Sequence, residues 1–81
     1  MIPGRLYRWK GGNAPLYNDT DAIVSWLDQK DILIFISVQE RPSTNNTLVK
    51  VVHQDVVGTI KFIGLDIAKF ESTWFEEALS D

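Results

Sequence analysis

The fold of this chain can be predicted from one stretch, Asp31-Ile32-Leu33-Ile34-Phe35-Ile36-Ser37-Val38. Its residues suit the side-chain period of two that defines a β-strand. Four apolar side chains at every second position, Ile34 among them, share one face, and Leu33 and Phe35 point the other way. A strand that is apolar on both faces needs cover on each side, as in a closed barrel, a sandwich or a complex with a partner. We expect Ile34 to lie in the core, together with Ile60 of a later strand.

Further short strands follow from the same alternation, and glycine, proline and asparagine mark the turns between them. Short strands joined by tight turns indicate an antiparallel all-β domain. The other expected strands are residues 5–10, 47–54 and 58–63, and residues 67–71 can serve as a final strand. Residues 23–27 are a second apolar segment, and loops are expected at 14–21 and 41–46.

The C-terminal part is expected to form a short helix. Thr73 and Glu76 have the spacing of a capping box, which predicts a helix from residue 74 to about 79. Ile67 and Trp74 also stand at near-helical spacing, so a helix that begins near Asp66 stays open as an alternative.

The composition limits the classes of protein to consider. The 81 residues are 44% hydrophobic and include no cysteine, so one small core must form without disulfides or thiolate metal sites. A net charge of −3 disfavours nucleic acid as a partner, because such proteins usually carry a basic face. No stretch approaches the ~20 apolar residues of a membrane span, and the N-terminal residues lack the apolar centre of a signal peptide. We therefore expect a single domain, residues 1–81, that is cytoplasmic rather than secreted or membrane-bound.

Four motifs, taken in order, resemble those of Src-homology-3 domains. They are residues 15–19, similar to the family's Ala-Leu-Tyr-Asp-Tyr opening; 27–32, similar to its diverging turn; 48–51, similar to the start of its third strand; and 57–60, similar to its fourth. The resemblance is closest to bacterial and viral members of this superfamily. It implies an all-β, five-stranded Src-homology-3-like barrel at about 5–71, with the C-terminal helix at about 74–79.

The departures from the family concern its groove for proline-rich peptides. That groove is lined by aromatic rings, of which only Tyr17 remains here. Asp19 stands in place of the second tyrosine and Leu48 in place of the tryptophan. Because proline rings dock on flat aromatic faces, we expect no binding of proline-rich peptides in the family's manner.

No set of residues in the sequence indicates a reaction or a cofactor. His53 is the only histidine, and no nucleophile motif such as Gly-x-Ser-x-Gly accompanies it. A calcium loop that began at Asp19 would need glycine and glutamate where Val24 and Lys30 stand. We therefore expect no enzymatic activity, no metal and no cofactor.

These observations favour a non-enzymatic protein-interaction or assembly module, as a small subunit of a bacterial or viral complex or of a virus particle. The second apolar face of the long strand and the adjacent aromatic pair near the C-terminus favour contact with another protein or with a second copy, as an oligomer. The candidate contact residues are Leu33, Phe35, Leu48, Val52, Trp74 and Phe75.

The alternative is a small-barrel nucleic-acid-binding protein that uses the one basic and aromatic cluster of the sequence. Aromatic rings can stack on bases while cations pair with phosphates. The candidate residues for this alternative are Arg5, Tyr7, Arg8, Trp9 and Lys10. Strand alternation separates the two aromatic residues from Arg8 and Lys10, and packing in a core explains the rings equally well.

Overall fold

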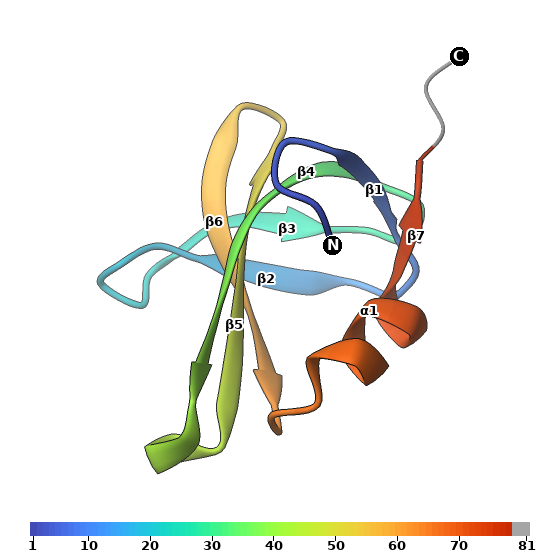
Figure 1. Cartoon of the computed structure of the whole chain (residues 1–81). Coiled ribbons are helices and arrows are strands. Elements are labelled where there is room, and N and C mark those ends of the chain that lie inside the picture. Colours follow the sequence, from blue (N-terminus) through green and yellow to red (C-terminus); the bar gives the residue numbers. More distant parts are fainter. Residues whose placement is uncertain (79–81) are drawn as a thin grey trace.

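The long apolar stretch forms the longest strand, β4, of the computed structural model, which describes residues 1–78 (Figure 1). The elements in chain order are β1 (Leu6–Trp9), β2 (Ala14–Tyr17), β3 (Ile23–Leu27), β4 (Ile32–Arg41), the 3-10 turn η1 (Pro42–Thr44), β5 (Asn46–His53), β6 (Val56–Ile63), α1 (Ile67–Trp74) and β7 (Phe75–Glu77).

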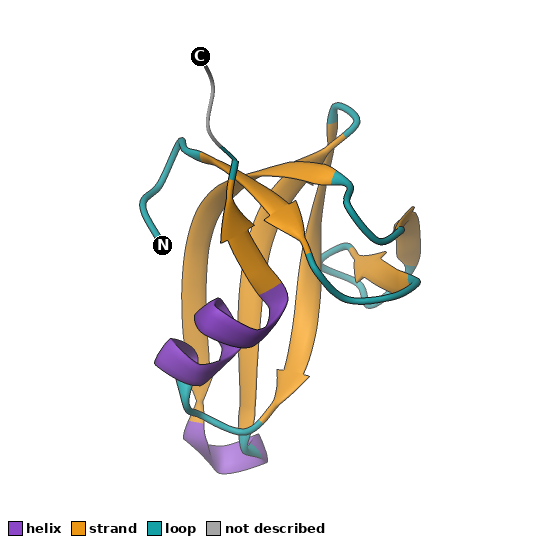
Figure 2. Cartoon of the chain, turned by 90° about the vertical axis from the view of Figure 1, so that its right-hand side faces the viewer, coloured by secondary structure: helices purple, strands orange, loops and turns teal. Residues whose placement is uncertain are grey.

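The seven strands form one antiparallel sheet in the order β3-β2-β6-β5-β4-β1-β7. The sheet curls into a half-barrel, and α1 lies beside β7 (Figures 1 and 2). The all-β class is confirmed, but the expected number of five strands is wrong. The additional strands are β2, which pairs with β3 and β6 where a loop was expected, β3 itself, and the short β7 at the far edge of the sheet. The expectation of a final strand at residues 67–71 is wrong, because these residues lie in α1.

The side of β4 that faces the core is the opposite of the predicted one. Leu33 and Phe35 are buried, with 1% and 4% of their surfaces exposed, whereas Ile34 is 37% exposed. Phe35 packs edge-on against the ring of Tyr7, at 6.4 Å between centroids. The expectation that Ile34 lies in the core is therefore wrong. The same expectation for Ile60 is confirmed, since its side chain is 3% exposed. Alternation could not choose between two apolar faces, and the face that carries the aromatic side chain is the one that packs.

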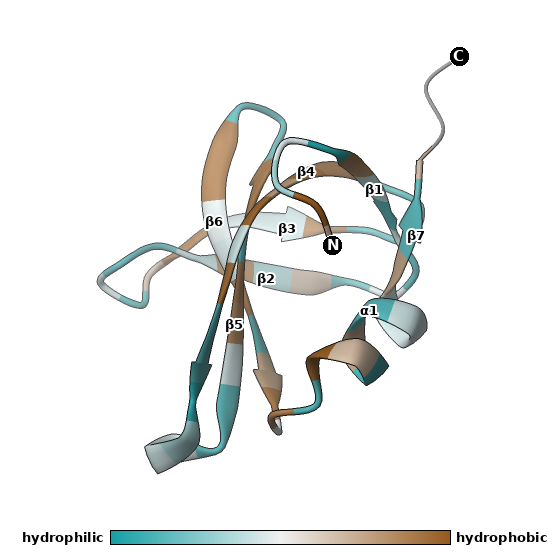
Figure 3. Cartoon of the chain, in the orientation of Figure 1, coloured by the Kyte–Doolittle hydropathy of each residue, from teal (hydrophilic) through white to brown (hydrophobic). Residues whose placement is uncertain are grey.

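A β-bulge in the middle of β4 reverses the direction of the side chains that follow it. Phe35 pairs with Val51 and Ser37 with Lys50, so that Ile36 is the extra residue. Beyond the bulge Ser37 therefore lies on the same face as Ile34. Figure 3 shows β4 changing from hydrophobic to hydrophilic along its length.

The C-terminal helix occupies the earlier of the two predicted positions. The Asp66 carboxylate accepts a hydrogen bond from the Lys69 backbone N–H at 3.1 Å and caps α1. The prediction of a helix at about 74–79 is wrong for residues 75–77, which form β7, and residue 79 lies outside the described residues. Register pairs Phe75 with Trp9 of β1, and its ring is buried at 5.4 Å from that of Trp9. Pairing with β1 therefore outweighs the local capping signal at Thr73.

Candidate functional site

The face of β4, β5 and β6 that points away from the core is divided into an apolar and a polar half. We call this the outer face. Its apolar half is a row of directly opposed residues across four strands, which we call the apolar row. The register pairs Leu6 with Ile34, Ile34 with Val52, and Val52 with Val57. Leu6 and Ile34 are each 37% exposed and Val57 is 51% exposed, so the apolar row meets solvent.

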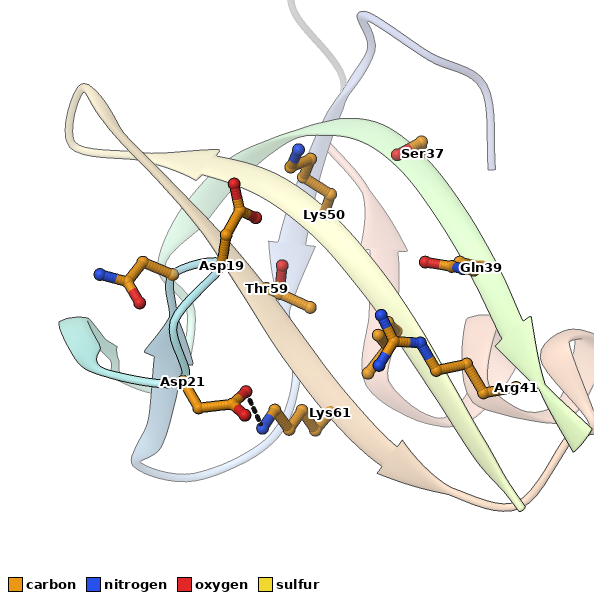
Figure 4. A pocket seen from close by; sticks show the side chains of 10 residues that line it. Asp19, Asp21, Ser37, Gln39, Arg41, Lys50, Thr59 and Lys61 are labelled. Atoms are coloured by element: carbon orange, nitrogen blue, oxygen red, sulfur yellow. Dashed lines mark hydrogen bonds and ion pairs between the residues drawn. The ribbon is translucent and has the colours of Figure 1, made fainter. Parts of the chain in front are cut away.

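The polar half begins at the bulge and continues to the ends of the three strands. Three rows cross it, Ser37–Lys50–Thr59, Gln39–Leu48–Lys61 and Arg41–Asn46–Ile63. Together with the tip of the β2–β3 hairpin, they enclose a cavity of about 310 Å³, which we call the groove (Figure 4). The groove is lined by Asn18, Asp19, Asp21, Ser37, Gln39, Arg41, Leu48, Lys50, Thr59 and Lys61.

The hairpin that closes the groove is held in place by polar contacts. Asn18 accepts hydrogen bonds at its side-chain oxygen from the backbone N–H groups of Thr20 and Ala22, at 2.9 and 3.0 Å. The Lys61 ammonium bonds to the Asp21 carboxylate at 2.6 Å and lies 4.4 Å from the centre of the Tyr17 ring. These contacts connect the hairpin tip to β6.

Lys61 also alters the titration of Asp21. Its hydrogen bond and its charge hold the pKa of the Asp21 carboxyl below the ordinary value, and the charge of Arg41 adds to this effect. A lowered pKa in the folded state means that the contact stabilises the fold above the ordinary aspartate pKa of about 3.9 and is lost as the pH falls through the lower folded-state value.

We predict that Lys61→Met raises the pKa of Asp21 towards that of an ordinary aspartate, because both main causes of the shift are removed. A carboxyl NMR titration measures this pKa directly. Lys69→Met, on the exposed surface of α1, is the control and should leave the Asp21 titration unchanged. If Asp21 had the same pKa in Lys61→Met as in the wild type, the ion pair would not form in solution.

Two cations of the groove are left without a protein partner. Within residues 1–78, neither the Arg41 guanidinium nor the Lys50 ammonium forms an ion pair, whereas Lys61 is paired with Asp21. Asp19, on the hairpin tip, is the second carboxylate of the groove. The groove therefore carries net positive charge in a chain whose total charge is −3.

The predicted protein-contact residues are distributed between the core and the surface. Leu33, Phe35 and Phe75 are buried in the core and present no surface to a partner in this fold. The other three are accessible: Leu48 lines the groove, Val52 belongs to the apolar row, and Trp74 is 37% exposed while it stacks on Trp9. The other members of the apolar row, Leu6, Ile34 and Val57, were not among the predicted contact residues. The opposite choice of face on β4 would have placed Ile34 there.

The basic and aromatic cluster of β1 is divided by the strand, as its alternation predicts. Tyr7 and Trp9 lie in the core, at 7% and 4% exposure, and cannot offer their faces to bases. Arg5 pairs with Glu77 at 2.7 Å and Arg8 with Glu76 at 3.3 Å, both across the β1–β7 edge. The Lys10 ammonium donates to the Ser72 carbonyl at 3.1 Å.

The structure unites three residues that the sequence does not place together. Ser25 Oγ lies 3.1 Å from His53 Nδ1, and His53 Nε2 lies 2.9 Å from an Asp31 carboxylate oxygen. The Asp31 carboxylate can only accept, so His53 donates to it through Nε2–H. The same residue types form catalytic triads, but here only 2% of His53 is exposed. The trio therefore has the character of a buried link between β3, β5 and the turn before β4.

Comparison with known proteins adds no family to these observations. In residues 1–78, no three His, Cys, Asp or Glu side chains gather as a set that could hold a metal ion. None of the helices in this part of the chain has the length and apolar character needed to cross a membrane. The chain matches no protein-family model, no curated protein and no solved structure.

Proposed function

We propose that this chain is a non-enzymatic protein-interaction module that binds another protein, or a second copy of itself, through its outer face. The apolar row carries this proposal. Exposed apolar residues that stand singly are ordinary, but a continuous apolar row across four neighbouring strands is typical of an interface. The adjoining groove adds polar groups of the kind found at the rim of such an interface.

The proposal includes a Src-homology-3-like barrel as the architecture. The segment predicted as a diverging turn leads into β4, and the motifs assigned to the third and fourth strands lie in β5 and β6. Asp19 and Leu48, which stand where the family has groove aromatics, line one groove together. These placements support a family-like groove whose lining is polar, and proline-rich peptides are not its ligands.

The setting that we propose is a cytoplasmic or virion assembly, in which the chain is a small subunit of a bacterial or viral complex. Enclosure of His53, with both ring nitrogens bonded, supports a non-enzymatic role. The inward direction of Tyr7 and Trp9 removes the main support for the nucleic-acid alternative.

We predict that Ile34→Ser or Val57→Ser weakens association, because each puts a hydroxyl in the apolar row. Ile2→Ser is the matched control, since Ile2 is 50% exposed and lies before β1, outside the strands of the outer face. Sedimentation at micromolar concentration measures the self-associating form, and circular dichroism verifies that each variant is folded.

A photo-crosslinking residue at position 57 tests for a different partner in cells that make the protein, with position 2 as the reference. We expect adducts from position 57 that disappear when Ile34→Ser is added. The proposal is overturned if the wild type is monomeric and position 57 gives no more adducts than position 2.

A further inference from the structure

We infer that the groove binds an extended acidic segment of the partner protein, with carboxylates held by Lys50 and Arg41. This inference rests on the proposed function, because it specifies what the partner presents to the outer face. It begins from the two groove cations that have no ion-pair partner within residues 1–78.

The cations of the groove follow the rows of the sheet. Lys50 lies in the row of Ser37 and Thr59, and Lys61 in the next row with Gln39. Arg41 stands in the row after that, opposite Asn46. Each row therefore contributes one cation, and successive rows lie two residues, or roughly 7 Å, apart along a strand.

An extended peptide has the same period. Its side chains return to one face every second residue, so carboxylates four positions apart are separated by roughly 13 Å. This is the separation of the rows that contain Lys50 and Arg41. Figure 4 shows the Arg41 side chain reaching from β4 across β5, which places its guanidinium over the groove.

The charges and hydroxyl groups of the other groove residues favour a negatively charged ligand. Asp21 is neutralised by Lys61 at 2.6 Å, so Asp19 is the one carboxylate that opposes the two unpaired cations. Ser37 and Thr59 flank Lys50 with hydroxyl groups that can donate to a carboxylate. Hydrogen bonds from charged donors to carboxylates are the strong kind, and they favour an acidic ligand over a neutral one.

The apolar row borders the groove and gives the segment a direction. The row next to that of Lys50, on the same face of the sheet, contains Ile34, Val52 and Val57. An extended segment that places an apolar side chain on the apolar row can therefore carry its first acidic residue over Lys50. The two halves of the outer face would then recognise one continuous strand of the partner.

The probe is a synthetic peptide with two aspartates four positions apart in a glycine and serine background. The reference peptides replace both aspartates with asparagine, replace them with lysine, or are proline-rich. We expect saturable binding of the aspartate peptide alone, measured by titration calorimetry or by NMR shifts of groove amides. This binding should weaken as salt is added, because the contacts are solvent-exposed.

We predict that Arg41→Ala and Lys50→Ala each weaken binding of the aspartate peptide by roughly threefold to tenfold. Asp19→Asn should strengthen it, because one repelling carboxylate is removed. Lys69→Ala is the matched control, since it removes the same charge from the exposed surface of α1, outside the groove, and should leave the affinity unchanged.

Several results would overturn the inference. One is equal binding of the aspartate and asparagine peptides, and another is an affinity that Lys69→Ala lowers as much as Arg41→Ala does. Tighter binding of single-stranded DNA, also lost in Arg41→Ala, would assign the groove to a nucleic acid instead. Ile34→Ser separates this test from the proposed function, because it should retain the peptide while it loses association. If the wild type associates through the outer face but does not bind the aspartate peptide, this inference is wrong and the proposed function still stands.

Discussion

Replacement of Leu33 by alanine is expected to lower the free energy of unfolding by about 2–5 kcal/mol. The same replacement at Ile34, the next residue, should cost only about 1 kcal/mol. Leu33 is 1% exposed among the side chains of the core, so its truncation leaves a cavity. Ile34 is 37% exposed on the outer face, where water fills the space that its side chain leaves.

Urea unfolding followed by tryptophan fluorescence measures both variants on one scale. The pair is a sensitive test because the two side chains are isomers and adjacent in sequence. If Ile34→Ala proved the more destabilising of the two, β4 would be reversed and the apolar row would belong to the core.

Replacement of His53 by alanine is the second change with a large expected effect, about 2–4 kcal/mol of destabilisation. It removes a buried ring and both of its hydrogen bonds, to Ser25 and to Asp31. The matched variant is Ser25→Ala, which removes one of those bonds without emptying the core and should cost about 0.5–1.5 kcal/mol.

Denaturant unfolding of the two variants shows whether His53 is a structural link. Similar losses in both would mean that the imidazole contributes little beyond one hydrogen bond. That result would also reopen a chemical role for Ser25, His53 and Asp31.

The strands at 5–10, 47–54 and 58–63 could be predicted because alternation and turn residues are local signals. The core face of β4 could not, since Leu33 and Ile34 fit either side of a strand equally well. The bulge at Ile36 leaves no mark in the residue pattern, and it depends on pairing with β5. Strand β2 was missed because Ala14 and Pro15 are poor strand residues that pairing with β3 nevertheless accommodates.

The candidate site was only partly accessible to sequence reasoning. Leu48 and Asp19 could be connected through a family resemblance, and both line the groove. Ser25 and Asp31 could not be connected with His53, because they lie 28 and 22 residues away from it and no motif joins them. Contacts of this kind arise from topology, which brings together the ends of strands that are distant in sequence.

The bulge in β4 decides which side chains of the second half of the strand lie on the outer face. If the strand ran through Ile36 without the bulge, the pairing beyond it would slip by one residue, so that Ser37 would turn towards the core and Val38 would turn outward. Substitutions on this surface can therefore accumulate during evolution one at a time, and each alters a single contact. An insertion or deletion in β4 that leaves the bulge in place exchanges the two faces of the strand beyond it. Deletion of Ile36 itself would only close the bulge, and Ser37 would stay opposite Lys50 on the outer face.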